Sequence, residues 1–166
     1  PMAGSEKSGM ANARPDLYQD ATIFLTPTED DEDMAIKLLR DFWTEIGGVP
    51  LELGAQRHDD AVAHTSHSLH LLAAAVVHSV LGEGDVDAHQ VAAAGGFRDL
   101  TRIASSDPDM WTQICRTNTA PTLKAMTDIQ AQLATVSGFL EAENWDGLRD
   151  YLDAARSTRD AWVEEK

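Results

Sequence analysis

The sequence predicts a mainly α-helical fold with one or two short strands near its N-terminus. Apolar residues at helical spacing fill most of the 166 residues, whereas only residues 21–28 (ATIFLTPT) have the β-branched and aromatic character of a strand. Residues 49–53 (VPLEL) are short and could form a second strand. Because strands need neighbours to be stable, we expect the rest of their sheet to lie outside this chain.

Start and stop signals divide the N-terminal half into helices. Thr28 and the acidic residues up to Asp33 predict a helix start, and the glycine pair that begins at Gly47 predicts its end. Residues 55–81 then have a helical pattern, in which residues 69–81 (LHLLAAAVVHSVL) are apolar nearly all round. A helix of that kind is buried in a core or against a partner, so we expect the chain to dimerise.

Three further helices are predicted in the C-terminal half. Residues 87–104 are interpreted as one helix that the glycine pair at 95–96 interrupts, at about 1 kcal/mol per glycine relative to alanine. Asp107 followed by proline is a strong signal for a new helix start. Apolar stripes then predict one helix up to about residue 140 and a last helix over residues 143–165.

Composition excludes several classes of partner. The chain has 13 Lys and Arg against 28 Asp and Glu, a formal charge of −15, which argues against nucleic acid and against an anionic membrane surface. Its single cysteine, Cys115, cannot form an internal disulfide and fits a reducing cytoplasm. No segment approaches the roughly 20 apolar residues of a membrane span. We therefore expect a cytoplasmic protein that binds neither nucleic acid nor membranes.

The segment GSEKSG at residues 4–9 superficially resembles a phosphate-binding loop. The P-loop pattern requires its lysine and a hydroxyl residue after the second glycine, whereas here Lys7 precedes Gly9 and Met10 follows it. We therefore expect no nucleotide P-loop, and a glycine-rich surface loop is the simpler interpretation.

Histidines cluster in the segment RHDDAVAHTSHSLH. His64, His67 and His70 are spaced three apart, so they spread over one broad face of a helix. His58 and Asp59 form an HD pair, and a metal-dependent phosphohydrolase would use this pair and His67 as ligands. Two adjacent residues are a weak signal, so the ordinary interpretation is that some of these histidines are buried and satisfied and the others solvated.

The segment GGFRDLTRIASSDPDMW places two arginines on one helical face. Arg98 and Arg102 are four residues apart and would repel by a few tenths of a kcal/mol, while Asp99 can pair with Arg102 and leaves Arg98 unpaired. An exposed, salt-bridged face is the ordinary interpretation. The glycine pair in front of the arginines favours a close approach by a backbone or a ligand, which would be an anion.

These segments together resemble the prephenate/arogenate dehydrogenase family. Residues 1–9 (PMAGSEKSG) resemble the family loop His-Pro-(Met/Ile)-Ala-Gly-(Thr/Ser)-Glu-Lys-Ser-Gly, and IFLTPT resembles the last strand of its nucleotide-binding domain. HDDAVAHTSHSLHLLA resembles the family helix HD…SHLPHLLA, and residues 95–111 resemble GGF(R/K)DxTRIAxSDPxMW almost letter for letter. The resemblance runs in order from residue 1 to about residue 140.

The resemblance implies an architecture. Family members join a Rossmann domain that binds NAD or NADP to a helical substrate-binding and dimerisation domain of the 6-phosphogluconate-dehydrogenase-like C-terminal type. Residues 1–28 would be the end of the first domain and residues 29–166 the second. We expect no Gly-x-Gly-x-x-Gly motif and no βαβ unit in this chain, and the family's catalytic histidine would precede Pro1. We therefore expect the chain by itself to be inactive.

The resemblance also implies an activity and a set of site residues. The activity is NAD(P)-dependent oxidative decarboxylation of prephenate to 4-hydroxyphenylpyruvate in tyrosine biosynthesis, with arogenate as the alternative substrate. Arg102 matches the arginine that binds a substrate carboxylate, and His67 matches the first histidine of the SHLPH run, whereas His64 and His70 receive no role. The implied substrate-binding residues are Ser5, Glu6, His67, Arg98, Asp99 and Arg102. The alternatives outside the family are a metal-dependent phosphohydrolase and a helical dimer module without a ligand.

Overall fold

The computed structural model describes residues 1–3, 9–10, 13–82 and 86–164. Helices account for most of them, which confirms the predicted mainly α-helical fold. The chain divides into two compact units, Pro1–Leu123 and Lys124–Lys166. Within the described ranges, no helix combines the length and the apolar character that a membrane crossing requires.

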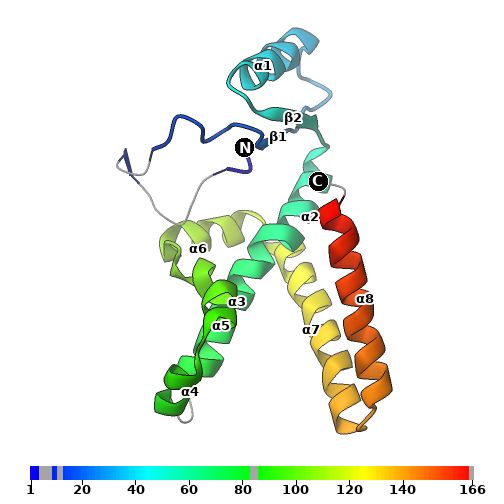
Figure 1. Cartoon of the computed structure of the whole chain (residues 1–166). Helices are drawn as coiled ribbons and strands as arrows, with labels where there is room; N and C mark the ends of the chain where they lie inside the picture. Colours follow the sequence, from blue (N-terminus) through cyan, green and yellow to red (C-terminus); the bar gives the residue numbers. More distant parts are fainter. Residues whose placement is uncertain (4–8, 11–12, 83–85, 165–166) are drawn as a thin grey trace. The chain divides into compact units, whose positions relative to one another are not determined.

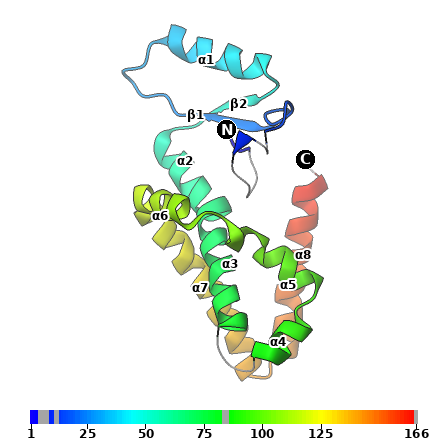
Figure 2. The same cartoon turned by 90° about the vertical axis from the view of Figure 1, so that its left-hand side faces the viewer.

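The first unit opens with a βαβ unit. Strand β1 (Thr22–Leu25) pairs in parallel with β2 (Val49–Glu52), and helix α1 (Asp33–Glu45) connects them. Figures 1 and 2 show α1 lying along one side of this strand pair. Both predicted strands are confirmed, but the expectation that the chain holds no βαβ unit was wrong. The reason is that the short second strand finds a neighbour within the chain, because a crossover helix of this length suffices to bring two parallel strands together.

The ends of α1 follow from local chemistry. Thr28 forms a turn before the helix, in which its backbone N–H and its hydroxyl donate to Asp31 Oδ2 at 2.7 and 2.9 Å. These hydrogen bonds to the charged form lower the pKa of Asp31. After the helix the chain turns through Gly47, whose φ is +91°, and a Cβ at this position would lie 2.5 Å from Gln19 Oε1. The predicted stop at this glycine is therefore confirmed.

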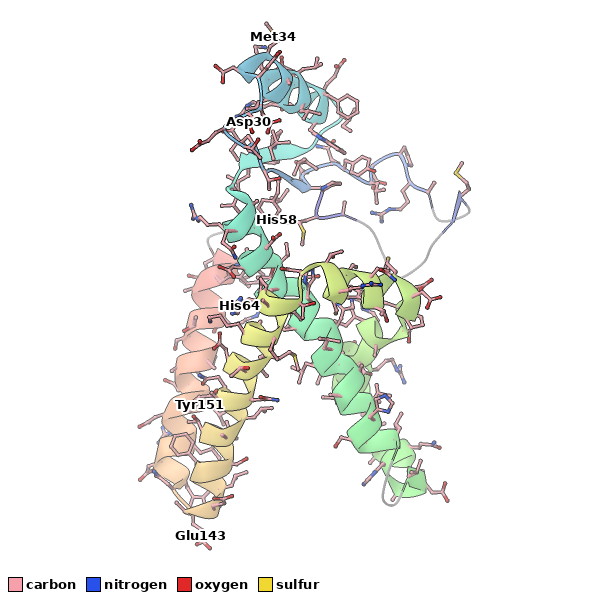
Figure 3. The ribbon with its side chains drawn as sticks, turned by 180° about the vertical axis from the view of Figure 1, so that it is seen from behind. Asp30, Met34, His58, His64, Glu143 and Tyr151 are labelled. Atoms are coloured by element: carbon pink, nitrogen blue, oxygen red, sulfur yellow. The ribbon has the colours of Figure 1, made fainter. Side chains whose placement is uncertain are left out.

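A long helical rod carries the histidines. It consists of α2 (Ala55–Val62), a π-helical turn η2 (Ala63–His67) and α3 (Ser68–Leu81), so the segment predicted as one helix contains a widened turn in its middle. Figure 3 shows His58 and His64 at successive levels of this rod. Several side chains bond to backbone carbonyls of the rod around the turn. The pairs are His64 Nδ1 with Asp60 O, Thr65 Oγ1 with Ala61 O, Ser68 Oγ with His64 O, and His70 Nδ1 with Ser66 O.

Three short helices follow where one interrupted helix was predicted. They are α4 (Val86–Ala92), α5 (Gly95–Thr101) and the 3-10 helix η3 (Arg102–Ser105). The residue before α5 is extended, so the two glycines at 95–96 begin a helix instead of lying inside one, and the predicted cost of glycines within a helix does not arise. A Cβ added at either glycine meets no described atom within 4 Å, so no packing against the described residues requires glycine there.

Helix α6 (Pro108–Thr117) starts where the sequence predicts. Asp107 Oδ1 accepts hydrogen bonds from the backbone N–H groups of Asp109 and Met110 at 2.8 and 3.0 Å, and proline occupies the first turn. Helix α7 (Thr119–Glu141) begins directly after Asn118, which ends α6. The predicted helix start at Asp107 is confirmed.

The second unit is a helical hairpin. The remainder of α7 and helix α8 (Trp145–Glu164) run antiparallel, with their turn at Glu143 (Figures 1 and 3). Tyr151 packs against Phe139 at 6.1 Å between ring centroids, and its hydroxyl donates to Gln132 Oε1 at 3.1 Å. These contacts hold the two helices of the hairpin side by side.

The core of the described chain is small for its length. The buried apolar side chains among the described residues are Ile23, Leu25, Val62, Ala63, Ala73 and Ala125. Along α3, which the sequence predicts to be buried on most sides, only Ser68 and Ala73 are buried. The apolar helix is therefore covered only in part by this chain.

We predict that Asp107→Ala lowers the free energy of unfolding by about 1 kcal/mol, because two backbone donors of α6 lose their acceptor. Chemical denaturation measures the loss. Asp109→Ala is the matched control, because it removes a carboxylate from the same first turn without removing a cap, and it should cost only about 0.5 kcal/mol through the helix dipole. Equal losses for the two variants would contradict a capping role for Asp107.

Candidate functional site

A pocket of about 390 Å³ lies between α2, η2 and the end of α6, and we call it the His67 pocket. Its lining residues are Met2, His58, Asp59, Val62, Ser66, His67, Ile114, Thr117 and Asn118. The lining combines titratable and other polar side chains with apolar ones, a mixture typical of small-molecule sites. Met2 reaches this pocket because its backbone N–H donates to Thr22 O at 2.8 Å.

His67 is held by two buried side chains from the junction of α6 and α7. Its Nδ1 lies 3.3 Å from Asn118 Nδ2 and 3.4 Å from Thr122 Oγ1. Asn118 Nδ2 also donates to the backbone carbonyl of Asp59 at 2.9 Å. Asn118 is 8% exposed and Thr122 is 4% exposed, so both polar groups depend on these partners for their hydrogen bonds.

The HD pair of the sequence forms a contact of its own. His58 Nδ1 lies 2.9 Å from Asp59 Oδ1, and the His58 ring meets the ring of Phe24 edge to face at 5.4 Å between centroids. Phe24 lies on β1, so this contact ties the histidine end of the rod to the sheet. The pair supplies the carboxylate that faces the His67 pocket.

A second pocket of about 370 Å³ lies beside α3, and we call it the Trp111 pocket. Its lining residues are His70, Leu71, Ala74, Ile103, Ala104, Ser106, Pro108, Trp111, Thr112 and Cys115. Trp111 stacks on His70 with 3.5 Å between ring centroids and meets His67 edge to face at 6.1 Å. The indole ring of Trp111 therefore links the two pockets through the two histidines.

The Trp111 indole N–H is buried, and no residue in the described part of the chain accepts a hydrogen bond from it. A buried donor without an acceptor is costly, by about 1–3 kcal/mol. Because Trp111 lines a pocket, a ligand or water in that pocket can supply the acceptor.

The environment of His67 favours its neutral form. Burial, and then the nearby His58 and His70, lower the pKa of His67 from its ordinary value of 6.5, and Asp59 acts in the opposite direction. At neutral pH His67 is therefore an uncharged hydrogen-bonding group.

The structure brings only part of the predicted site together. His67 lies at the centre of the cluster just described. Arg102 begins η3, which packs on α3, and the next two residues of η3 line the Trp111 pocket, while the Arg102 side chain is exposed. Arg98 and Asp99 are exposed on α5 and line neither pocket. The predicted roles of all three remain predictions.

Two predicted site residues, Ser5 and Glu6, lie outside the described residues, as does most of the GSEKSG loop. The start of that loop is described up to residue 3, and Met2 lines the His67 pocket. The predicted role of the loop in lining the site stays a prediction.

The described residues do not favour the metal-dependent phosphohydrolase. No group of three or more His, Cys, Asp or Glu among them is arranged to hold a metal ion. His58 and Asp59 bond to each other, and His67 bonds to Asn118 instead of joining them.

Sequence reasoning missed Asn118 and Thr122. They lie 51 and 55 residues from His67 along the chain, and nothing in the spacing of either residue marks it as a partner of a histidine. The only available signal was that a helix ends at Asn118, since asparagine is common at helix ends.

We predict that protonation of His67 makes the free energy of unfolding depend on pH. Its pKa is lower in the folded than in the unfolded protein, so the unfolded protein binds more protons as the pH falls below 6.5, and the free energy of unfolding decreases there. In His67→Gln, which cannot titrate, this decrease between about pH 7 and pH 5 should be smaller. Denaturation series at several pH values measure it, and identical pH slopes for the two proteins would contradict the lowered pKa.

Two family models match the chain. The prephenate dehydrogenase dimerization domain matches residues 54–154, which is more than half of the chain. The prephenate dehydrogenase nucleotide-binding domain matches residues 1–52.

Known proteins of the same kind match nearly the whole chain. The prephenate dehydrogenase of Bacillus subtilis (strain 168) is 34% identical over 161 residues, which are 96% of this chain and 43% of that protein. The crystal structure of prephenate dehydrogenase from A. aeolicus, in complex with hydroxyphenyl propionate and NAD+, is 30% identical with a TM-score of 0.88 over 95% of this chain and 56% of that one. Synechocystis arogenate dehydrogenase is 28% identical with a TM-score of 0.86 over 98% and 59%.

The chain spans about half the length of the relatives that it matches. Within that span, both the helical part with its histidine rod and the βαβ unit correspond to named parts of one enzyme family. The resemblance carried by the GSEKSG, SHSLH and GGFRDLTRIASSDPDMW segments is thereby confirmed. The chain belongs to the prephenate dehydrogenase family.

Proposed function

We propose that the protein carrying this chain oxidises and decarboxylates prephenate to 4-hydroxyphenylpyruvate, a step of tyrosine biosynthesis, with NAD or NADP as hydride acceptor. In this proposal the chain supplies the substrate-binding and dimerisation parts of the enzyme. The observation that supports it best is the His67 pocket together with the Trp111 pocket, built on a chain of this family. Arogenate is the alternative substrate, because Synechocystis arogenate dehydrogenase has a similar structure.

The chemistry of the two pockets suits such a substrate. Prephenate and arogenate carry carboxylates and a ring hydroxyl on a largely apolar six-membered ring, so their site needs both apolar walls and a few hydrogen-bonding groups. The neutral His67 offers a hydrogen bond, and the buried indole N–H of Trp111 lacks an acceptor among the described residues. We propose that the ring and one oxygen of the substrate meet these two side chains.

Arg102 is proposed to bind a substrate carboxylate, with Arg98 and Asp99 beside it. A guanidinium group presents a fixed fork of donors that fits a carboxylate in two parallel hydrogen bonds. The position of η3 against α3 supports this role, since the two residues after Arg102 line the Trp111 pocket. Ser5 and Glu6, which lie outside the described residues, are proposed to complete the site.

This chain's own described residues do not form a dinucleotide site. The described turn from β1 into α1 is acidic, and its Asp31 is engaged by Thr28, whereas a pyrophosphate needs a glycine-rich turn with free backbone N–H groups. NAD or NADP, when bound, supplies the acceptor for the hydride that leaves the ring carbinol carbon, and we propose that its phosphates are held by other parts of the protein.

The division between the two parts of the chain stays a prediction. The sequence predicts it after residue 28, where the first predicted strand ends. The βαβ unit and the family model that covers residues 1–52 favour a later division, near residue 53.

We predict that Arg102→Gln, made in the full-length enzyme, lowers kcat/KM roughly ten- to hundredfold, mainly through a higher KM. The reason is that the loss of a charged hydrogen bond costs about 1.5–3 kcal/mol. Steady-state kinetics with prephenate and with arogenate measure the effect and identify the substrate. Arg116→Gln, which removes an exposed arginine of α6, is the control and should change neither constant. A lower melting temperature of Arg102→Gln with unchanged kinetics would make Arg102 a structural residue.

We propose that the protein is a homodimer, because this chain covers so little of its apolar surface. Large apolar side chains that remain exposed on α7 and α8 are Leu123, Leu133, Leu140, Trp145, Leu152, Trp162 and Val163. Large apolar side chains left exposed in such number are typical of a protein interface. The matched dimerization domain supports the same proposal.

We predict a dimer mass in light scattering at micromolar concentration. Leu152→Glu should shift the equilibrium toward the monomer, because it places a charge on an apolar residue of α8 that is 58% exposed in this chain. Ser157→Glu adds the same charge at an exposed polar position of the same helix and should leave the mass unchanged. A monomer mass for the unmodified protein would refute the dimer.

A further inference from the structure

We propose that Asn118 and Thr122 are positioning residues that hold His67 in the tautomer with its proton on Nε2. The inference rests on three hydrogen-bond distances among buried groups. The tautomer assigned to His67 does not depend on which substrate binds, whereas the consequence for substrate binding rests on the proposed function.

The orientation of the Asn118 amide decides the tautomer. Asn118 Nδ2 lies 2.9 Å from the Asp59 backbone oxygen, which can only accept a hydrogen bond. The opposite orientation of the amide would place two oxygens at that distance, so the nitrogen must face Asp59. The same nitrogen lies 3.3 Å from His67 Nδ1 and has a second N–H to donate. His67 Nδ1 must therefore accept, and in the neutral ring the proton is on Nε2.

Thr122 is compatible with the same assignment but does not decide it, because a hydroxyl can donate or accept. Its hydroxyl lies 3.4 Å from His67 Nδ1 and is free to rotate, so it can donate to a nitrogen that carries no proton. Both partners are buried, so neither group can turn to water instead. The two side chains together hold one side of the imidazole ring.

The neighbouring histidines carry their protons on the other nitrogen. His64 Nδ1 and His70 Nδ1 lie 2.8 and 3.0 Å from backbone carbonyls of their own rod, which cannot donate, so each of these histidines is itself the donor through Nδ1. His67 differs from both because its partners come from the α6–α7 junction instead of from its own helix. His64 and His70 therefore serve as internal references when the tautomer of His67 is measured.

The groups that face His67 are consistent with a neutral ring. His58 and Asp59 face it from α2 and His70 faces it from α3, while the described contacts from α6 and α7 are with the uncharged Trp111, Asn118 and Thr122. Asp59 is the one negative charge among them, and it is engaged with His58 at 2.9 Å.

The consequence for the site is a fixed donor. With Nδ1 held, Nε2–H is the ring position left to a ligand, and no described residue bonds to it. His67 lines the pocket, so this donor is offered to an oxygen of the substrate, a carboxylate or a hydroxyl. A histidine free to change tautomer would present an acceptor there part of the time and would bind the same oxygen less well.

The test is NMR of the full-length protein labelled with ¹⁵N at histidine side chains, with the His67 signals assigned by their loss in His67→Gln. We expect His67 to show an unprotonated Nδ1 and a protonated Nε2, while His64 and His70 show the reverse. Asn118→Asp places a carboxylate beside Nδ1, so the proton should move to Nδ1 and the pKa of His67 should rise by about one unit or more. Thr119→Val is the control, because Thr119 bonds only within its own helix junction, and it should change nothing.

Kinetic measurements on variants of Asn118 and Thr122 show whether these residues position His67 or only stabilise the fold. In Asn118→Asp the neutral ring presents an acceptor at Nε2, so kcat/KM should fall roughly tenfold at neutral pH and recover as the pH is lowered and the ring gains its second proton, because the charged ring donates from both nitrogens. Thr122→Val should reduce kcat/KM and Thr122→Ser should restore it. If His67 carries its proton on Nδ1 in the unmodified protein, the proposal is overturned even when no variant folds. If the tautomer is as proposed but neither prephenate nor arogenate is turned over, only the proposed function fails.

Discussion

The Asn118 amide is the contact on which the geometry of the site depends. It joins the backbone of α2 to the imidazole ring of η2 from the junction where α6 ends and α7 begins. Since Asn118 is almost fully buried, a shift of any of these elements would leave a polar group unpaired, at about 1–3 kcal/mol. This penalty keeps α2, η2 and the α6–α7 junction in their relative positions, although few large apolar side chains among the described residues are buried.

The two pockets are parts of one aromatic cluster. Trp111 touches His70 face to face and His67 edge to face, and both histidines belong to the same rod. The cap at Asp107 sets where α6 begins, so it also sets the height at which Trp111 meets the rod. The Asp107 cap is a local feature of the sequence, yet it determines how Trp111 joins the two pockets.

Local signals predicted the elements well and the long-range contacts poorly. Strand composition, the stop at Gly47 and the cap at Asp107 depend on neighbouring residues, and all three were confirmed. The parallel pairing of β1 with β2 was missed because pairing depends on a crossover, which strand composition does not reveal. His67 was found through family resemblance, whereas Asn118 and Thr122 were not, because their contact arises only when α6 and α7 fold back on the rod.

The widened turn at Ala63–His67 sets the phase of everything after it. A π-helical turn holds one residue more than an α-helical turn, and each residue of an α-helix advances the side chain by about 100° around the axis. Removing one residue here would restore a regular helix and rotate Ala73, now buried, by more than a quarter of a turn relative to α2. The face of α3 on which α5 and η3 pack would rotate with it. An insertion or deletion in this stretch would therefore turn that face of α3 away from its partners.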